Sequence, residues 1–210
     1  REVYAAVKNA FDESHGIINE LYWRDFYGHL LDAYPRILNS NMKEKYDAVP
    51  WREDEEGLQR WKEGRTGFPI VDAAMRQLVK TGWMHNRCRM IVACFLCKDL
   101  RIHWKKGERF FAQHLIDYDP ASNNGGWQWA ASTGADSQPY FRIFNPWSQQ
   151  ERYDENCEYI KKFVPELRSL DPSDIHDWKS IQIEEVAYPA PMIDHQTASK
   201  KTKKVFKQAI

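Results

Sequence analysis

Apolar residues recur three or four positions apart along much of this chain, which is the spacing of one face of an amphipathic helix. The first run covers residues 17–33 and stops at Tyr34-Pro35, because a residue before proline is driven out of the helical conformation. A second run starts at Gly67-Phe68-Pro69 and closes at Gly82, which suits the position just after a helix. The pattern therefore indicates helices and almost no strands, and we predict an all-α fold. Helices are expected at 17–33, 67–82, 84–100, 106–116, 126–134, 155–163 and 194–208.

Two segments lack this periodicity. Residues 36–50 and 168–190 are polar, carry prolines or show no helical spacing, so we interpret them as loops. The predicted helix at 84–100 is apolar in its centre, whereas its first turns are polar and basic. The chain thus consists of helices joined by a few longer loops, without an internal repeat or a low-complexity tract.

The stretch from Asp117 to Ser132 is unusually rich in functional groups. Within sixteen residues it holds two aspartates, two asparagines, two glycines and two tryptophans. The Asp-x-Asp-Pro start can cap a turn, and the Asn-Asn-Gly-Gly segment lets backbone approach a flat ligand closely. Two interpretations remain open at this point. The stretch is either a ligand site or a tight turn between helices whose tryptophans belong to the core.

Tryptophan usage favours the ligand site. The chain has nine tryptophans in 210 residues, more than core packing requires when leucine, isoleucine and phenylalanine can fill the same space. Each buried indole also needs an acceptor for its N–H. Aromatic rings can stack on bases or flavins, hold cations and relay single electrons, so a nucleic acid or a redox cofactor becomes plausible.

Charge and hydropathy narrow the class of protein. Thirty basic and thirty acidic residues give a formal net charge of zero, so any contact with DNA must come from a local patch. No apolar run approaches the ~20 residues of a membrane span, and no signal-peptide pattern is found. We expect a soluble, intracellular protein, cytoplasmic in a bacterium and nuclear in a eukaryote.

The four cysteines predict no metal centre. Cys94-x-x-Cys97 matches half of a zinc or redox motif, but it lies in an apolar helical run without a second pair or a histidine at ligand spacing. Buried, reduced thiols are the better interpretation. The basic residues at 200–207 are interpreted as a solvated helix face and not as a targeting signal.

Four longer motifs carry a family resemblance. They are Glu20–Tyr27, Gly64–Arg76, Gly82–Met90 and the Asn-Asn-Gly-Gly-Trp block at 123–127. Together they resemble the DNA photolyase and cryptochrome family in its own order and spacing, and the resemblance extends from about residue 17 to 195.

The resemblance implies a fold and a cofactor. The family has an amino-terminal α/β antenna domain followed by an all-helical domain that holds FAD bent into a U shape. This chain resembles only the later, larger part of the helical domain. We therefore expect a single α-helical FAD-binding domain over residues 1–210. The antenna domain with its pigment, and the upstream Thr-Ser-x-Leu-Ser type segment that grips the FAD phosphates, are expected to be absent from the chain.

The resemblance also assigns flavin contacts. Asn123 would lie beside flavin N5. Arg89 and Asp117 would form an ion pair along the flavin edge, and Asp119 would contact the polar rim of the ring. A positive group helps to hold the reduced flavin as an anion, because an opposite charge favours the charged form.

Other positions are implied to contact the DNA lesion. Glu20 would hydrogen-bond to a thymine carbonyl, Asn86 would face the lesion, and Met90 would cover the same pocket. Trp23 and Trp129 would stack on a pyrimidine dimer flipped out of the duplex. Ordinary core packing is the alternative for both tryptophans.

Three tryptophans match the family's electron relay from the surface to the flavin, namely Trp51, Trp104 and Trp127, and core filling is the alternative for them. Arg87 and Arg142 resemble cations that bind phosphates on either side of the lesion. Solvated surface charge is the alternative for these arginines.

Departures from other subfamilies favour one class. The chain has His85–Met90 where six-four photolyases and animal cryptochromes have a histidine-rich pattern. It has Asn123 where plant cryptochromes usually have aspartate, and Met90 where DASH-type members usually have glutamine. The resemblance therefore implies a monomeric class I cyclobutane pyrimidine dimer photolyase, in which excited reduced FAD donates an electron to the dimer. A cryptochrome-like blue-light photoreceptor and a non-catalytic helical DNA-binding fragment are the alternatives.

Overall fold

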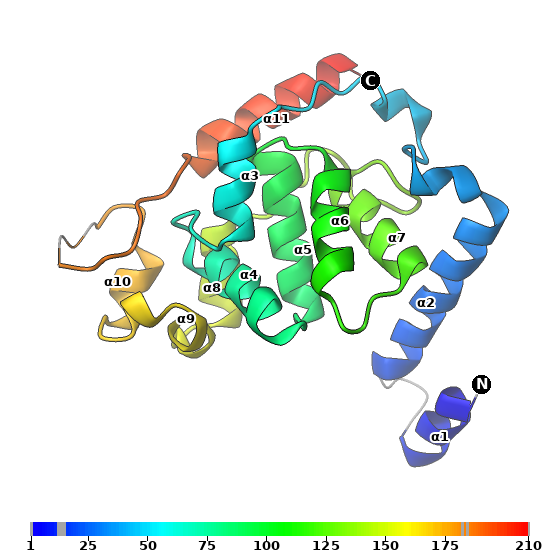
Figure 1. Cartoon of the computed structure of the whole chain (residues 1–210), viewed down its shortest axis with the longest axis horizontal. Helices are drawn as coiled ribbons and strands as arrows, with labels where there is room; N and C mark the ends of the chain where they lie inside the picture. The colour runs from blue at the N-terminus through cyan, green and yellow to red at the C-terminus, as the bar shows by residue number, and fades with distance from the viewer. Residues whose placement is uncertain (1, 12–15, 182, 184, 210) are drawn as a thin grey trace.

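A computed structural model describes residues 2–11, 16–181, 183 and 185–209. Helices joined by loops make up this part of the chain, with no strand among these residues, and the predicted all-α class is confirmed (Figure 1). The longer helices are α1 (Glu2–Ala10), α2 (Gly16–Ala33), α3 (Glu55–Lys62), α4 (Pro69–Thr81), α5 (Asn86–Cys94), α6 (Trp104–His114), α7 (Pro120–Ala131), α8 (Pro146–Tyr153), α9 (Glu158–Phe163), α10 (Pro172–His176) and α11 (His195–Ala209). Short helical turns are η1 (Pro35–Leu38), η2 (Glu44–Tyr46), the π-turn η3 (Phe95–Asp99) and η4 (Pro165–Leu167).

Helix boundaries agree with prediction where proline and glycine set them. Helix α4 starts at Pro69 and is followed by Gly82, whose φ of 69° is left-handed. Helix α7 begins earlier than the expected residue 126, because Asp119 caps it and Pro120 occupies its first turn. The predicted helix at 84–100 is two elements, since the π-turn η3 follows α5 directly. Helices α1, α3, α8 and α10 lie in segments for which no helix was expected.

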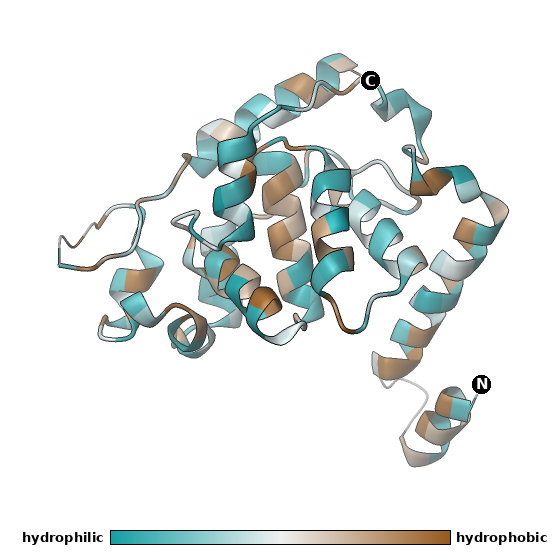
Figure 2. Cartoon of the chain, in the orientation of Figure 1, coloured by the Kyte–Doolittle hydropathy of each residue, from teal (hydrophilic) through white to brown (hydrophobic). Residues whose placement is uncertain are grey.

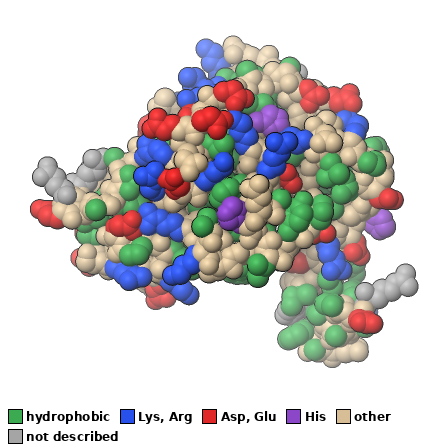
Figure 3. Space-filling model, in the orientation of Figure 1, with side chains coloured by type: hydrophobic (Ala, Val, Ile, Leu, Met, Phe, Trp, Pro, Cys, Tyr) green, Lys and Arg blue, Asp and Glu red, His purple; other side chains and the backbone are tan. Residues whose placement is uncertain are grey.

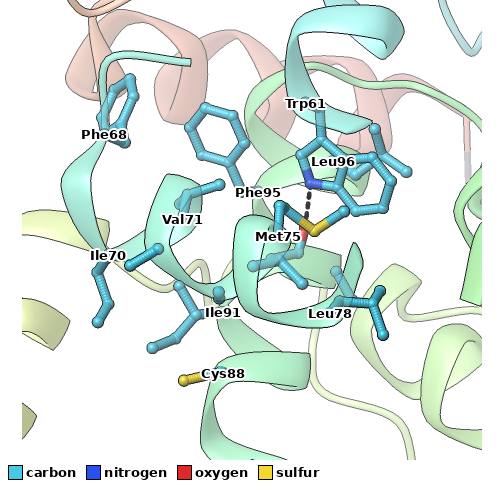
Figure 4. Packing of buried hydrophobic residues seen from close by; sticks show 14 of the residues in the cluster. Trp61, Phe68, Ile70, Val71, Met75, Leu78, Cys88, Ile91, Phe95 and Leu96 are labelled. Carbon is cyan, nitrogen blue, oxygen red and sulfur yellow. Dashed lines mark hydrogen bonds between the residues drawn. The ribbon is translucent and has the colours of Figure 1, made fainter. Parts of the chain in front are cut away.

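The core surrounds α4 and α5. Helix α4 packs on α5, α8 and α9, and α5 packs on α7, which in turn contacts α6. Figure 2 shows the hydrophobic colour on much of α5, whereas the visible faces of the helices around it are largely hydrophilic. Figure 4 shows how Trp61 packs with Met75 and Leu96, and the Trp61 indole N–H donates to the Val92 carbonyl at 3.1 Å. The main cluster of buried side chains therefore fixes α5 and α7 relative to each other, and a second, small cluster of Tyr46, Val49 and Phe206 lies beside α11.

Helix α2 lies at one side of this core and packs on α7. The two helices approach closely because α7 has a glycine at the contact: a Cβ on Gly125 would lie 2.1 Å from Cδ1 of Tyr27. Helix α1 projects beyond α2, and Figure 3 shows hydrophobic side chains gathered on this projecting arm. The rest of α2 exposes aromatic rings, including Trp23 and Phe26.

Helix α11 is fixed to the π-turn by buried polar contacts. The Lys98 ammonium lies 3.9 Å from the Phe206 ring centroid, and His195 Nδ1 lies 2.6 Å from Asp99 Oδ1. The Thr202 hydroxyl donates to the Lys98 carbonyl at 2.5 Å. Lys98 also donates to the Ala131 carbonyl and the Ser132 hydroxyl, so this cluster joins α11 to the end of α7.

The cysteines are buried thiols, as the sequence suggested. All four cysteines are free and buried, and burial raises the pKa of the Cys94 thiol to about 12. Within the described residues, no group of three or more histidine, cysteine or acidic side chains is arranged to hold a metal ion. Over the same residues, no helix is both long enough and apolar enough to cross a membrane.

Candidate functional site

A cavity of about 530 Å³ lies between α2, the first turns of α5 and α7. Its volume is within the range of about 300–1,000 Å³ that small-molecule and cofactor sites occupy. Every residue that the sequence assigned to a flavin or a lesion lines this one cavity, including groups more than 100 positions apart. These residues are Glu20, Trp23, Asn86, Arg89, Met90, Asp117, Asp119, Asn123 and Trp129, and Trp127 of the expected relay lines the cavity as well.

The expected ion pair is present at the edge of the cavity. Arg89 Nη2 lies 2.7 Å from Asp117 Oδ2, and Arg89 Nε donates to the Met84 carbonyl at 2.7 Å. The guanidinium is therefore held in place from two sides. The Asp117 side chain is 45% exposed, so the pair contributes about 1 kcal/mol or less to stability and acts mainly by orienting its charges.

Asn123 is fixed from behind by helix α6. Its Nδ2 donates to the Glu108 carbonyl at 3.1 Å and to Glu108 Oε1 at 3.0 Å. Both bonds use the amide nitrogen, so they set the orientation of the amide within the cavity wall. The sequence did not indicate Glu108, because only the packing of α6 on α7 brings it to Asn123.

Asp119 has a structural task beside its place in the cavity wall. Its Oδ1 accepts a hydrogen bond from the Ser122 backbone N–H at 2.7 Å and so caps α7. A negative charge is favoured at a helix amino terminus. Asp119 therefore positions both α7 and the polar rim of the cavity.

Aromatic rings form the apolar part of the lining. Trp127 is 2% exposed and packs edge-on against Phe111, with the ring centroids 5.0 Å apart. On the other side Trp23 stacks on Tyr27, with centroids 5.8 Å apart and an interplanar angle of 28°. Burial raises the pKa of Tyr27 to about 12, so its hydroxyl stays protonated at neutral pH. The cavity thus combines flat apolar walls with a polar rim.

The other two tryptophans of the expected relay lie outside the cavity. Trp104 is fully buried at the start of α6, and Trp51 is partly buried. The His103 ring lies close to both, with centroids 5.3 Å from Trp51 and 5.6 Å from Trp104. Burial of Trp104 and Trp127 also satisfies the core-filling alternative, since both belong to the main hydrophobic cluster.

Neither of the expected phosphate-binding arginines lines the cavity. Arg87 lies on the α5 side with its guanidinium carbon 4.6 Å from the Tyr153 ring centroid and 5.9 Å from that of Phe144. This stacking accounts for its partial burial. Arg142 is exposed in the loop before α8.

Nine further lining residues were not predicted from the sequence, and Arg24, Tyr27 and Trp83 are three of them. Arg24 follows Glu20 by one helical turn, and that spacing could have indicated it. Tyr27 and Trp83 also line the cavity. Trp83 follows the end of α4 and is 43% exposed, and only the folding of that loop toward α2 reveals its place.

Comparisons with known proteins agree with this geometry. The sequence profile described as the FAD binding domain of DNA photolyase matches residues 17–208. The deoxyribodipyrimidine photo-lyase of Vibrio cholerae is 53% identical over 194 residues, which cover 91% of this chain and 41% of that protein. The chain therefore spans less than half the length of this curated relative.

Solved structures give the same result. An archaeal photolyase from Sulfolobus tokodaii, described with two FAD molecules, superimposes with a TM-score of 0.91 at 41% identity, over 98% of this chain and 47% of that chain. A class III photolyase from Agrobacterium tumefaciens gives 0.89 at 41% identity, over 99% and 46%. A Synechocystis cryptochrome gives 0.88 at 36% identity, over 98% and 45%. The expected family is confirmed, and the chain belongs to the photolyase and cryptochrome family, of which it carries the FAD-binding domain.

Proposed function

We propose that this chain is the flavin- and lesion-binding part of a light-driven cyclobutane pyrimidine dimer photolyase of class I, and that residues 1–210 form one helical domain. The observation that carries the proposal is the convergence of two sets of side chains on one cavity. One set, around Asn123, Arg89 and Asp117, suits the polar edge of a flat ring system. The other set, around Glu20, Asn86 and Met90, suits a damaged base.

The cavity fits a flavin ring in chemistry as well as size. Gly126 lines the cavity, and a Cβ built on it meets no atom within 4 Å, so this glycine leaves room where a side chain would project. Trp127 and Met90 offer apolar surface, and Arg89 offers a cation that favours negative charge on a bound ring. When FAD is bound in reduced form, it supplies the light-excited electron that is lent to the dimer and then returned.

The lesion would enter from the side of α2. Glu20 and Trp23 lie one turn apart on this exposed helix, while Asn86 and Met90 lie one turn apart on α5. A flipped-out dimer placed between these walls could stack on the Trp23 ring. Glu20 and Asn86 would hold its polar edges, so the negative charge that arrives with the electron would be stabilised there.

DNA would be held by local charge, because the chain has no net charge. We propose that Arg87 and Arg142 contact phosphates next to the lesion and that the protein binds as a monomer. Arg87 already has its guanidinium face on Tyr153, which leaves the N–H groups at its edge for a phosphate.

A cryptochrome-like photoreceptor is the second candidate, and the similarity to the Synechocystis cryptochrome favours it. A titration in the dark separates the two functions. Matched duplexes with and without one thymine dimer are added to the flavin-loaded protein at two salt concentrations. A repair enzyme should prefer the damaged duplex at both, while overall affinity falls as salt rises. Equal affinity for the two duplexes would reject repair and favour the photoreceptor.

A further inference from the structure

The indole N–H of Trp104 is bound to a side chain and not to backbone. Trp104 is fully buried, and its Nε1–H donates to Asn41 Oδ1 at 2.8 Å. Two other buried tryptophans use backbone carbonyls instead: Trp61 donates to Val92 and Trp178 to Pro189. The Trp104 indole therefore contacts a side-chain amide oxygen, whereas the other two indoles contact backbone carbonyls.

Asn41 is held so that its oxygen faces Trp104. Its Nδ2 donates to Asp47 Oδ1 at 2.7 Å, and its own carbonyl accepts from Arg36 at 3.1 Å. Asn41 is 5% exposed, whereas Asp47 is exposed to solvent. The three groups form a line from a buried indole through a buried amide to a surface carboxylate. The carboxylate polarises the amide and increases the negative character of the oxygen at Trp104.

This arrangement matters if Trp104 loses an electron. An oxidised indole carries a positive charge, and its N–H becomes acidic. A neutral amide is too weak a base to take that proton, but its oxygen and the carboxylate behind it stabilise the positive charge. We propose that Asn41, oriented by Asp47, is a positioning residue that stabilises oxidised Trp104 as a protonated radical cation and so lets the relay continue outward to Trp51.

The same contact favours Trp104 over Trp61 as the next electron donor. Trp61 lies 6.0 Å from Trp127 between ring centroids and is equally buried, yet its N–H faces the Val92 backbone carbonyl and not a side-chain amide. The Lys105 ammonium lies 5.9 Å from the Trp104 ring centroid and disfavours positive charge there. The Asp47 carboxylate offsets that cation. Without the Asn41–Asp47 pair, Trp104 would lose its advantage over Trp61 as the next donor.

The electron count rests on the proposed function and on the relay of Trp127, Trp104 and Trp51 that the family resemblance implies. With FAD in the cavity, Trp127 would give one electron to the light-excited oxidised flavin, and Trp104 would give one electron to oxidised Trp127. Trp51 then gives one electron to Trp104, which returns to its neutral, N–H-bearing form. No proton leaves Trp104 at any step, because Asn41 does not accept one.

The test uses flavin-loaded protein in a Trp51→Phe background, where the oxidised state stops at Trp104. Transient absorption reports whether the oxidised indole is a protonated radical cation or a deprotonated neutral radical. Indole N–H exchange, followed by NMR in the dark, reports the hydrogen bond itself. Glu158→Gln is the matched control, because Glu158 is an exposed carboxylate of α9, which packs on α4, and among the described residues it bonds to neither Trp104 nor Lys105.

We expect Asn41→Asp to convert the signal to a neutral radical, since a carboxylate at that position takes the proton. Asn41→Leu should speed Trp104 N–H exchange and lower the yield of oxidised Trp104 about tenfold. Asp47→Asn, a surface change that keeps the fold, should lower the yield of oxidised Trp104 several-fold. A protonated radical cation in Asn41→Asp would overturn the inference. Equal yields of oxidised Trp104 in Asn41→Leu, Asp47→Asn and the control would also overturn it. Either result would leave the proposed function untouched. Normal flavin photoreduction in Trp104→Phe overturns the relay itself, and the inference with it.

Discussion

Two neighbouring glycines on α7 offer a paired test of the flavin cavity. Gly125 is buried against α2, and a Cβ there would lie 2.1–2.8 Å from three ring atoms of Tyr27. Gly126 lines the cavity, and a Cβ there meets nothing within 4 Å. Replacement by alanine therefore adds one methyl group to the same helix at either position, buried against α2 at Gly125 and open to the cavity at Gly126.

The two alanine variants should differ in stability. Alanine in place of glycine within a helix gains about 1 kcal/mol, and nothing opposes that gain at Gly126. At Gly125 the whole Tyr27 ring must move, and such overpacking costs about 1–3 kcal/mol. We therefore expect Gly126→Ala to raise the free energy of unfolding by about 0.5–1 kcal/mol. Gly125→Ala should leave it unchanged or lower it by up to about 2 kcal/mol.

Flavin affinity should change in a different way. The new methyl group of Gly126→Ala projects into the cavity, so we expect FAD to bind about tenfold more weakly, a loss of ~1.4 kcal/mol. Urea unfolding without flavin and FAD titration by fluorescence quenching measure the two quantities on the same preparations. Wild-type affinity in a stabilised Gly126→Ala variant would refute the placement of the flavin in this cavity.

Three further predictions concern the relay, the lesion and the buried lysine. Trp51→Phe should abolish photoreduction of oxidised flavin but leave repair intact after the flavin is reduced chemically. Normal photoreduction in this variant would show that Trp51 only fills the core. Glu20→Ala and Asn86→Ala should each lower dimer repair per absorbed photon without altering the flavin absorption spectrum, and unchanged repair would remove that residue from the lesion site. Burial lowers the pKa of Lys98 from 10.5 to about 8, so between those values the unfolded chain binds more protons and the contribution of Lys98 to stability rises with pH. The difference in free energy of unfolding, wild type minus Lys98→Met, should therefore rise by about 2–3 kcal/mol between about pH 7 and about pH 10. Urea unfolding measures this difference, and a value that stays constant with pH would contradict the prediction.

Helices were predictable where local and tertiary preferences agree. Helix α4 combines helical spacing with a proline at its start and a glycine after its end, so its bounds follow from the sequence. Helix α7 begins six residues before the predicted position. Its first part was not predicted because Asn-Asn-Gly-Gly has poor helix propensity on its own. Close contact with α2 requires Gly125, and this packing outweighs propensity. The π-turn at Phe95–Asp99 escapes any search for a period of 3.6 residues.

The cavity residues were predictable as a set because they lie in or near recognisable sequence motifs. The contacts that hold these residues in place were not predictable. Glu108 reaches Asn123 only through the packing of α6 on α7. Asn41 reaches Trp104 across 63 positions, from a segment interpreted as a plain loop. Contacts of this kind depend on how elements pack, and no local pattern in the chain encodes them.

Light-driven repair is the central claim, and one experiment addresses it most directly. Reduced, flavin-loaded protein is mixed with a duplex carrying one thymine dimer, and half of the sample is illuminated with blue or near-ultraviolet light while half stays dark. Chromatography of the digested DNA then measures dimer and intact thymine. We predict that thymine is restored in the light, that the dimer persists in the dark, and that the flavin remains reduced. An unchanged dimer in the light, with flavin bound and the damaged duplex bound, would contradict the account.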